Sequence, residues 1–138
     1  TVCAECHGRD ALGGDGGVIV NTASVAGLIG YGGVVYGSTK GAVAILTRTL
    51  AVEVAGRGIR VNAVCPAGMP TNFIAQGFGS SPMARESMSK SHPLGRPIEP
   101  AECASAALFL ASDLSSNITG VNLPVDGGLS AGIKVGGK

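Results

Sequence analysis

The chain has 138 residues, of which 45% are hydrophobic and 14% are charged, and its formal net charge is +1. This composition excludes a disordered segment, and the length suffices for one domain with a buried core. Trp is absent and there is no basic or acidic run, which argues against a nucleic acid or an anionic membrane as partner, and no apolar run approaches the roughly 20 residues that span a bilayer.

The first elements follow from apolar runs and the residues that interrupt them. Residues 1–12 are ambiguous, and we interpret them as the end of a helix. The glycine string at 13–17 predicts a turn, because it breaks any regular element. Residues 18–22 form a short apolar run, which is typical of a buried parallel strand. A glycine-rich loop then extends to residue 33.

A proline-free segment with apolar residues at helical spacing predicts a helix over 36–56. Residues 59–64 predict the next strand, which Pro66 ends. The stretch 66–97 is irregular and typical of a lid or binding loop, with one short helix near 82–90. Its apolar side chains either line a substrate pocket or pack beneath the lid: Phe73, Ile74, Phe78 and Met88.

The last elements are a helix over 101–112, for which Pro100 fits the first turn, and a short strand near 121–125. Pro124 in that strand predicts a position at the edge of the sheet. Strands and helices alternate along the chain. The order therefore predicts an α/β fold with three parallel strands, near 18–22, 59–64 and 121–125 in that spatial order, and right-handed crossovers.

Tyr36 and Lys40 are four residues apart at the start of the predicted helix and therefore lie on one helix face. A tyrosine with the ordinary pKa of about 10 is a poor base at neutral pH. One ammonium at about 4 Å, in an effective dielectric near 20, stabilises a phenolate by on the order of 4 kcal/mol. That is enough to make a tyrosine a general acid/base near neutral pH. Taken alone, the spacing also fits a tyrosine that packs and a lysine in solvent.

Ser24 strengthens the catalytic interpretation of the pair. It lies just past the strand at 18–22, at the carboxyl end, where open α/β sheets bind ligands. The glycine-rich loop can fold the chain back and bring the Ser24 hydroxyl near that of Tyr36. We therefore expect Ser24, Tyr36 and Lys40 to converge at the carboxyl ends of the strands.

These segments closely resemble the active-site region of the short-chain dehydrogenase/reductase family. The resemblance rests on the run 18–27 and on Tyr-Gly-Ser-Thr-Lys-Gly-Ala at 36–42, and it extends over roughly residues 13–130. Later landmarks are the segments 58–66, 94–97, 99–102, 109–113, 118–120 and 125–128. The resemblance implies the C-terminal half of a Rossmann-like, doubly wound parallel sheet. It makes 1–138 one partial domain, with the active-site segment at 18–71 and the lid at about 69–97.

The resemblance implies an NAD(P)-dependent oxidoreductase that interconverts a secondary alcohol and a ketone by hydride transfer. In that scheme Tyr36 transfers the hydroxyl proton, Lys40 assists it and binds the nicotinamide ribose, and Ser24 polarises the substrate oxygen. Residues 66–71 hold the nicotinamide carboxamide. The implied cofactor-binding residues are Tyr36, Lys40, Pro66, Ala67, Gly68 and Thr71. No metal is implied, the substrate stays open, and NAD is favoured over NADP.

The resemblance also implies a cytoplasmic homodimer or homotetramer. Helix 36–56 would form one interface, with small residues such as Ala44, Ala51 and Ala55 permitting close helix approach. The helix 101–112 and the last strand would form another.

Three departures from the family pattern stand out. There is no G-x-G-x-x-G phosphate-binding match, no Asn precedes Asn21, and Ala67 separates Pro66 from Gly68. We therefore expect about half of the domain to lie upstream of Thr1. The 138 residues alone are expected to be inactive. They are also expected to associate through an unpaired edge of the strand at 18–22.

Two alternatives remain open. One is a non-catalytic fragment that acts only through packing. The other is a c-type haem protein, because Cys3-Ala4-Glu5-Cys6-His7 has the haem-attachment pattern, although no export signal is visible. His92 is interpreted as a loop histidine bonded to backbone or water rather than as a proton relay. Cys65 and Cys103 are interpreted as free buried thiols.

Overall fold

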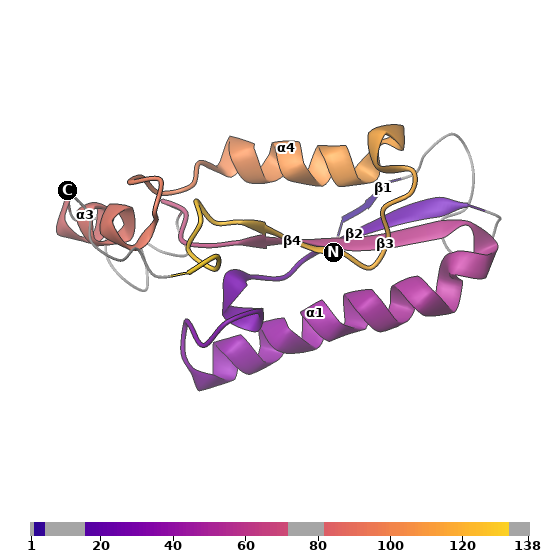
Figure 1. Cartoon of the computed structure of the whole chain (residues 1–138), viewed down its shortest axis with the longest axis horizontal. Helices are drawn as coiled ribbons and strands as arrows, with labels where there is room; N and C mark the ends of the chain where they lie inside the picture. Colours follow the sequence, from indigo (N-terminus) through magenta and orange to yellow (C-terminus); the bar gives the residue numbers. More distant parts are fainter. Residues whose placement is uncertain (1, 5–15, 72–81, 133–138) are drawn as a thin grey trace.

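The computed structural model describes residues 2–4, 16–71 and 82–132, and its centre is a sheet in the order β1-β2-β3-β4 (Figure 1). The strands β2, β3 and β4 are parallel, which confirms the three predicted strands and their spatial order. The edge position predicted from Pro124 is also confirmed, because β4 ends the sheet. The strand bounds are Val2–Ala4 for β1, Gly17–Thr22 for β2, Ile59–Pro66 for β3 and Asn122–Val125 for β4.

Two crossover helices cover the opposite faces of the sheet (Figure 1). Helix α1, Val34–Val54, begins two residues before the predicted start and continues into a 3-10 turn, Ala55–Arg57. Helix α4 spans Pro100–Ala111, with Pro100 in its first turn as predicted, and a 3-10 turn follows at Asp113–Ser115. Helix α3, Pro82–Ser91, lies beyond the end of the sheet where α1 and α4 begin. None of the helices in the described ranges is both long and apolar enough to cross a membrane.

The core has two halves because side chains alternate across the sheet. On β2, Val18 and Val20 pack with Leu110 of α4, whereas Ile19 packs with Ala51 of α1. Both faces of the strand are thus buried, as the unbroken apolar run predicted. Ala44 and Ala51 are buried within the chain itself. The expectation that they permit contact with another subunit is therefore wrong.

The amino end of the sheet is closed by polar side chains from β3. The guanidinium of Arg60 donates hydrogen bonds to the carbonyls of Leu110 and Ser112, at 2.9 and 3.0 Å. The amide of Asn62 donates to the carbonyl of Ile118 at 2.8 Å, and this side chain is fully buried. The bonds from Arg60 satisfy carbonyls that the end of α4 leaves without intrahelical donors.

The strand β1 corrects two expectations. Residues 2–4 form a strand rather than the end of a helix, and residues 5–12 lie outside the described ranges. A three-residue apolar segment carries too little periodicity to separate the two states. This strand pairs antiparallel with β2, Val2 opposite Val20 and Ala4 opposite Val18. The edge of β2 is therefore covered over Val18–Val20, where the sequence predicted an unpaired edge.

Candidate active site

Tyr36 and Lys40 lie in the first two turns of α1, and Ser24 follows directly on β2. In a parallel β-α-β unit, the crossover helix begins near the carboxyl end of the strand before it. That topology places all three candidate residues at the carboxyl end of the sheet, as Figure 1 shows for the start of α1. It is also the end at which open α/β sheets bind ligands.

The Ser24 side chain is buried and its hydroxyl links two strand ends. Its Oγ accepts a hydrogen bond from the backbone N–H of Ala26 at 3.2 Å, which caps the 3-10 turn Val25–Gly27. The same hydroxyl donates to the carbonyl oxygen of Pro66, the last residue of β3, at 3.3 Å. The Ser24 hydroxyl is therefore oriented by β2, β3 and the turn at once.

The Lys40 ammonium lies beside both the strand end and the tyrosine ring. Its Nζ donates to the carbonyl oxygen of Thr22 at 3.1 Å and lies 5.8 Å from the centre of the Tyr36 ring. Thr22 is the last residue of β2, two positions before Ser24. One lysine thus connects the start of α1 to the segment that carries Ser24. The role of Thr22 could not be predicted from its residue type, because only its backbone carbonyl takes part.

Two glycines allow the Ser24 segment to touch the backbone of α1. A Cβ on Gly27 would lie 2.5 Å from the carbonyl carbon and oxygen of Lys40. A Cβ on Gly37 would lie 3.1 Å from the carbonyl oxygen of Ala26. The first distance is shorter than real Cβ contacts, so glycine is required at residue 27, and the second is a tight contact that favours glycine at residue 37. The glycine-rich loop therefore folds back onto the helix start, as the sequence predicted.

The proposed carboxamide segment follows β3 at the same end. The N–H of Ala67 donates to the carbonyl of Val125 at 3.2 Å, and the carbonyl of Gly68 accepts from the N–H of Ile98 at 3.5 Å. The N–H of Thr71 donates to the carbonyl of Met69 at 2.7 Å. The backbone of 66–71 is thus held between β4 and the segment that precedes α4. The start of this segment contacts Ser24, because the Ser24 hydroxyl donates to the carbonyl oxygen of Pro66.

Helix α3 packs on that segment through Met88 and His92. A Cβ on Gly68 would lie 2.8 Å from the Met88 sulfur and 4.0 Å from His92 Cε1. His92 is 2% exposed, and its Nδ1 lies 2.5 Å from the carbonyl oxygen of Met88. The expected bond to backbone is confirmed, and the imidazole is buried. The other apolar candidates of the lid, Phe73, Ile74 and Phe78, lie outside the described residues.

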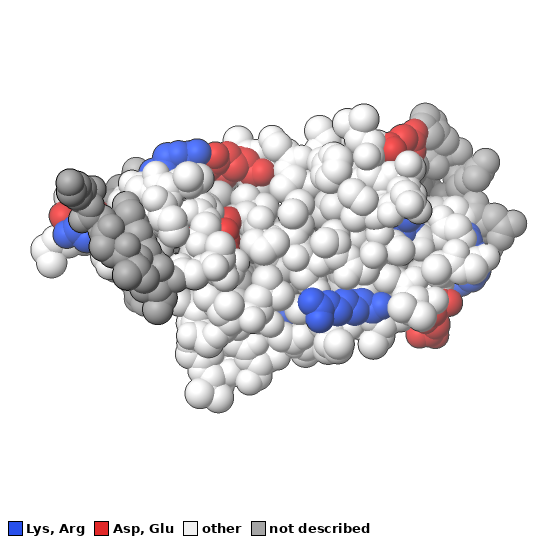
Figure 2. Space-filling model, in the orientation of Figure 1, with Lys and Arg blue, Asp and Glu red and all other residues white. Residues whose placement is uncertain are grey.

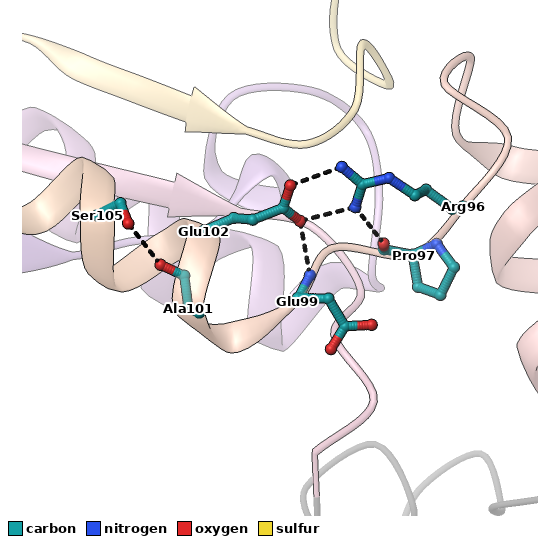
Figure 3. A network of polar contacts seen from close by, with 6 residues as sticks. All are labelled: Arg96, Pro97, Glu99, Ala101, Glu102 and Ser105. Carbon is teal, nitrogen blue, oxygen red and sulfur yellow. Dashed lines mark hydrogen bonds and ion pairs between the residues drawn. The ribbon is translucent and has the colours of Figure 1, made fainter.

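Cavities of about 400 and 300 Å³ adjoin this end of the molecule. The larger follows the glycine-rich loop and the start of α1, with Ile29, Tyr31 and Val34 in its lining. The smaller is lined in part by Arg96 and Glu102, which form a two-point ion pair with N–O distances of 2.8 and 2.6 Å (Figure 3). Glu102 also accepts from its helix N-cap N–H, so this network fixes the start of α4.

Cys65 and Cys103 are not activated as thiolate nucleophiles. Cys65 and Cys103 are free thiols, as predicted, although Cys103 is only half-buried. Burial raises the pKa of the Cys65 thiol to about 11, against the opposing effects of the Ser24 backbone and the Lys40 charge. Burial also raises the pKa of Cys103. Among the described residues, no group of three or more His, Cys, Asp or Glu side chains could hold a metal ion. Residues 5–7 of the haem-like pattern lie outside the described ranges.

Comparison with known proteins gives consistent matches over most of the chain. Residues 2–130 match the family model described as enoyl-(acyl carrier protein) reductase. The chain is 47% identical over 116 residues to the meso-2,3-butanediol dehydrogenase of Serratia marcescens, a match that covers 83% of this chain and 45% of that protein.

Solved structures agree with the sequence matches. The aldohexose dehydrogenase of Thermoplasma acidophilum superposes with a TM-score of 0.79 at 37% identity, covering 89% of this chain and 51% of that one. A gluconate 5-dehydrogenase of Burkholderia cenocepacia, in complex with NADP and tartrate, superposes with a TM-score of 0.78 at 32% identity, covering 86% and 47%. The chain therefore spans about half the length of the relatives it matches.

Proposed function

The chain belongs to the short-chain dehydrogenase/reductase family, and from this membership we propose that the natural protein containing it interconverts a secondary alcohol and a ketone with NAD or NADP. The observation that carries the proposal is the grouping of Ser24, Tyr36 and Lys40 at the carboxyl end of β2. When bound, the nicotinamide supplies or accepts the hydride. The residues of this chain bind the cofactor, orient the substrate and exchange the proton.

In this proposal, Tyr36 is the general acid/base. Reduction of a ketone requires a proton on the developing alkoxide, and oxidation of an alcohol requires its removal. The ammonium of Lys40 lies 5.8 Å from the centre of the phenol ring, so a positive charge stands beside the ring that exchanges the proton. Its bond to the Thr22 carbonyl holds the charge at this position. That bond uses one of the three ammonium donors. We assign the remaining capacity to the ribose hydroxyls of the cofactor.

Ser24 orients the substrate oxygen. Its Oγ accepts from the N–H of Ala26, which fixes the oxygen in place. Its proton is directed at the Pro66 carbonyl over a long 3.3 Å bond. We propose that this donor turns to the substrate oxygen when substrate binds, while the Ala26 bond is kept. A hydroxyl with a fixed acceptor side and a movable proton suits this polarising role.

The nicotinamide end of the cofactor fits the backbone donors and acceptors of residues 66–71. We propose that Pro66, Ala67, Gly68 and Thr71 position the carboxamide, with 18–71 as the active-site segment and about 69–97 as the lid. The backbone bonds of 66–71 to β4 and to Ile98 support this role, because a positioned amide needs fixed partners. No residue used here distinguishes the ribose 2′ positions of NAD and NADP.

The test is an assay of the natural protein with NADH and NADPH against a panel of small ketones, with the Tyr36→Phe variant beside it. We expect turnover by the natural protein. The Tyr36→Phe variant should lose nearly all turnover but still bind the cofactor. We choose the classes of substrate for this panel from the relatives, which are named for a diol, an aldohexose and a gluconate. A natural protein that binds neither cofactor would refute the proposal.

Residues 1–138 alone form a second arm of the test. Because they contain no G-x-G-x-x-G phosphate-binding turn, we expect no saturable titration with NADH. We also expect self-association on size-exclusion chromatography, driven by apolar surface. A sharp monomer peak with saturable NADH binding would contradict both expectations.

We propose that copies of the natural protein assemble through α1 and α4. Both helices carry exposed apolar side chains, whereas charged side chains are scattered without a large patch of one sign on the face that Figure 2 shows. Exposed apolar patches of this kind mark interfaces. The exposed residues are Val34, Val35, Ile45, Leu46 and Val52 on α1, and Leu108 and Phe109 on α4. Sedimentation of the natural protein tests the assembly, and a strict monomer would contradict it.

A further inference from the structure

His92 lies where the lid helix, the carboxamide segment and the turn after β4 meet. A Cβ on Gly127 would lie 3.3 Å from His92 Cδ2, and a Cβ on Gly68 would lie 4.0 Å from Cε1. The imidazole therefore fills the space between the ends of β3 and β4. The N–H of Leu94 donates to the carbonyl of Gly127 at 3.1 Å and closes the same junction.

The hydrogen bonds define the tautomer of the ring. The nearest partner of Nδ1 is the carbonyl oxygen of Met88, and a carbonyl only accepts. Nδ1 therefore carries the proton, and in the neutral ring Nε2 is an acceptor. This Nε2 is buried and has no hydrogen-bond partner among the described residues. Nδ1 also lies 3.3 Å from Ser91 Oγ, but that hydroxyl donates its proton to the same Met88 carbonyl at 2.8 Å. The Met88 carbonyl is therefore the closer of the two polar contacts that orient the ring.

We propose that His92 is a positioning residue for the nicotinamide-binding segment 66–71, acting through its Nδ1–H bond to Met88. That bond ties the end of α3 to the ring. The side chain of the same Met88 lies against Gly68, since a Cβ on Gly68 would lie 2.8 Å from the Met88 sulfur. Ring and thioether together form one wall of the segment. The inference rests on the proposed function, which assigns 66–71 to the nicotinamide.

The hydrogen bonds of residues 66–71 explain why the packing of His92 and Met88 matters for their position. The segment's backbone bonds beyond Pro66 to neighbouring elements are long, 3.2 Å from Ala67 to Val125 and 3.5 Å from Ile98 to Gly68. Packing must then supply part of the positional restraint. A segment that loses this restraint has to be ordered by the cofactor itself, which weakens binding. We expect proton exchange at Tyr36 to be unaffected, because the polar contacts of His92 Nδ1 run to Ser91 and Met88.

The main experiment compares His92→Phe with His92→Asn in the natural protein. Phenylalanine keeps a ring but has no donor, whereas the amide nitrogen of asparagine reaches the place of Nδ1 and can donate to the Met88 carbonyl. We expect the phenylalanine variant to raise the KM and the Kd for the nicotinamide cofactor by about tenfold, with kcat nearly unchanged. The asparagine variant should recover most of that affinity. Full affinity in the phenylalanine variant, or equal loss in both variants, would overturn the proposal.

A second measurement needs no cofactor. The 15N spectrum of the His92 ring should show the Nδ1–H tautomer, and hydrogen exchange in α3 should be faster with phenylalanine and slower again with asparagine. An Nε2–H tautomer would overturn the proposal. If the phenylalanine variant does not fold, His92→Gln replaces it and should lose affinity in the same way. A natural protein that binds no nicotinamide cofactor would refute the proposed function alone, because tautomer and exchange report on the contact independently.

Discussion

The two ends of the sheet are built differently. At the amino end, Arg60 and Asn62 donate hydrogen bonds to backbone carbonyls of the chain itself. At the carboxyl end, glycines bring backbones into direct contact, and Ser24 and Lys40 each hold one strand end with a single donated bond. At the amino end, the side-chain donors therefore hydrogen-bond to the backbone of the fold. At the carboxyl end, the Lys40 ammonium keeps N–H donors that a ligand can use. Stability and chemistry are separated along the strand direction.

The sharpest break of this comparison is Tyr36→Phe in the natural protein. Removing one hydroxyl at the carboxyl end should lower turnover by about 10²- to 10⁴-fold, the usual contribution of a general acid/base, and leave the melting temperature unchanged. Steady-state kinetics and thermal unfolding measure the two effects. Tyr31→Phe is the matched control, because it removes another exposed phenol five residues earlier. An active Tyr36→Phe enzyme would exclude Tyr36 as the acid/base.

Arg60→Met at the amino end should have the opposite effect, a loss of stability without a loss of activity. It keeps an apolar stem but removes the charged donor that joins three carbonyls and Ser115, and each of these acceptors loses one hydrogen bond. We expect a loss of about 3 kcal/mol in the free energy of unfolding, with kcat per folded molecule unchanged. Urea denaturation of the natural protein measures it. Arg48→Met, at an exposed arginine of α1, should cost far less. Equal effects would remove the distinction between the two ends.

Gly27→Ala tests the close approach at the carboxyl end. The new Cβ would lie 2.5 Å from the Lys40 carbonyl, so α1 must move and carry Tyr36 and Lys40 with it. We expect both stability and activity to fall, the former by about 1–3 kcal/mol. Gly30→Ala is the control, because nothing lies within 4 Å of its Cβ. If Gly27→Ala behaves like Gly30→Ala, the loop does not rest on the helix.

Glu102→Gln should have the smallest effect, seen only in acid. The hydrogen bonds from Arg96 hold the pKa of Glu102 at about 2, below its ordinary value of 4.5. A depressed folded-state pKa stabilises the fold above 4.5 and loses that contribution as the pH falls toward 2. The variant should therefore show a flatter decline of stability in this window. Glu86→Gln, which removes an exposed pair with Lys90, should leave the decline unchanged. An identical acid profile for Glu102→Gln and the natural protein would contradict the assignment.

The sequence predicted the parallel strands and their order, because apolar runs between breakers and a proline at one edge are local signals. It also singled out Ser24, Tyr36 and Lys40, whose residue types and spacing support the proposed site. It missed β1, since three apolar residues fit either a strand or a helix end. The Thr22 carbonyl and the Met88–His92 contact were also missed. Backbone partners and buried contacts between distant segments leave no pattern in the residue types.

The long crossovers of the sheet have a consequence for the order of folding. Gly17 pairs with Ile59 across the whole of α1, and Ala63 pairs with Asn122 across a still longer separation that includes α3 and α4. Closing the longer loop costs more chain entropy, so the β2–α1–β3 unit should assemble first and β4 should dock late. Arg60 and Asn62 join β3 to that late region. Loss of these hydrogen bonds should accelerate unfolding more than it slows folding. The amino end of the sheet would then set the lifetime of the native state.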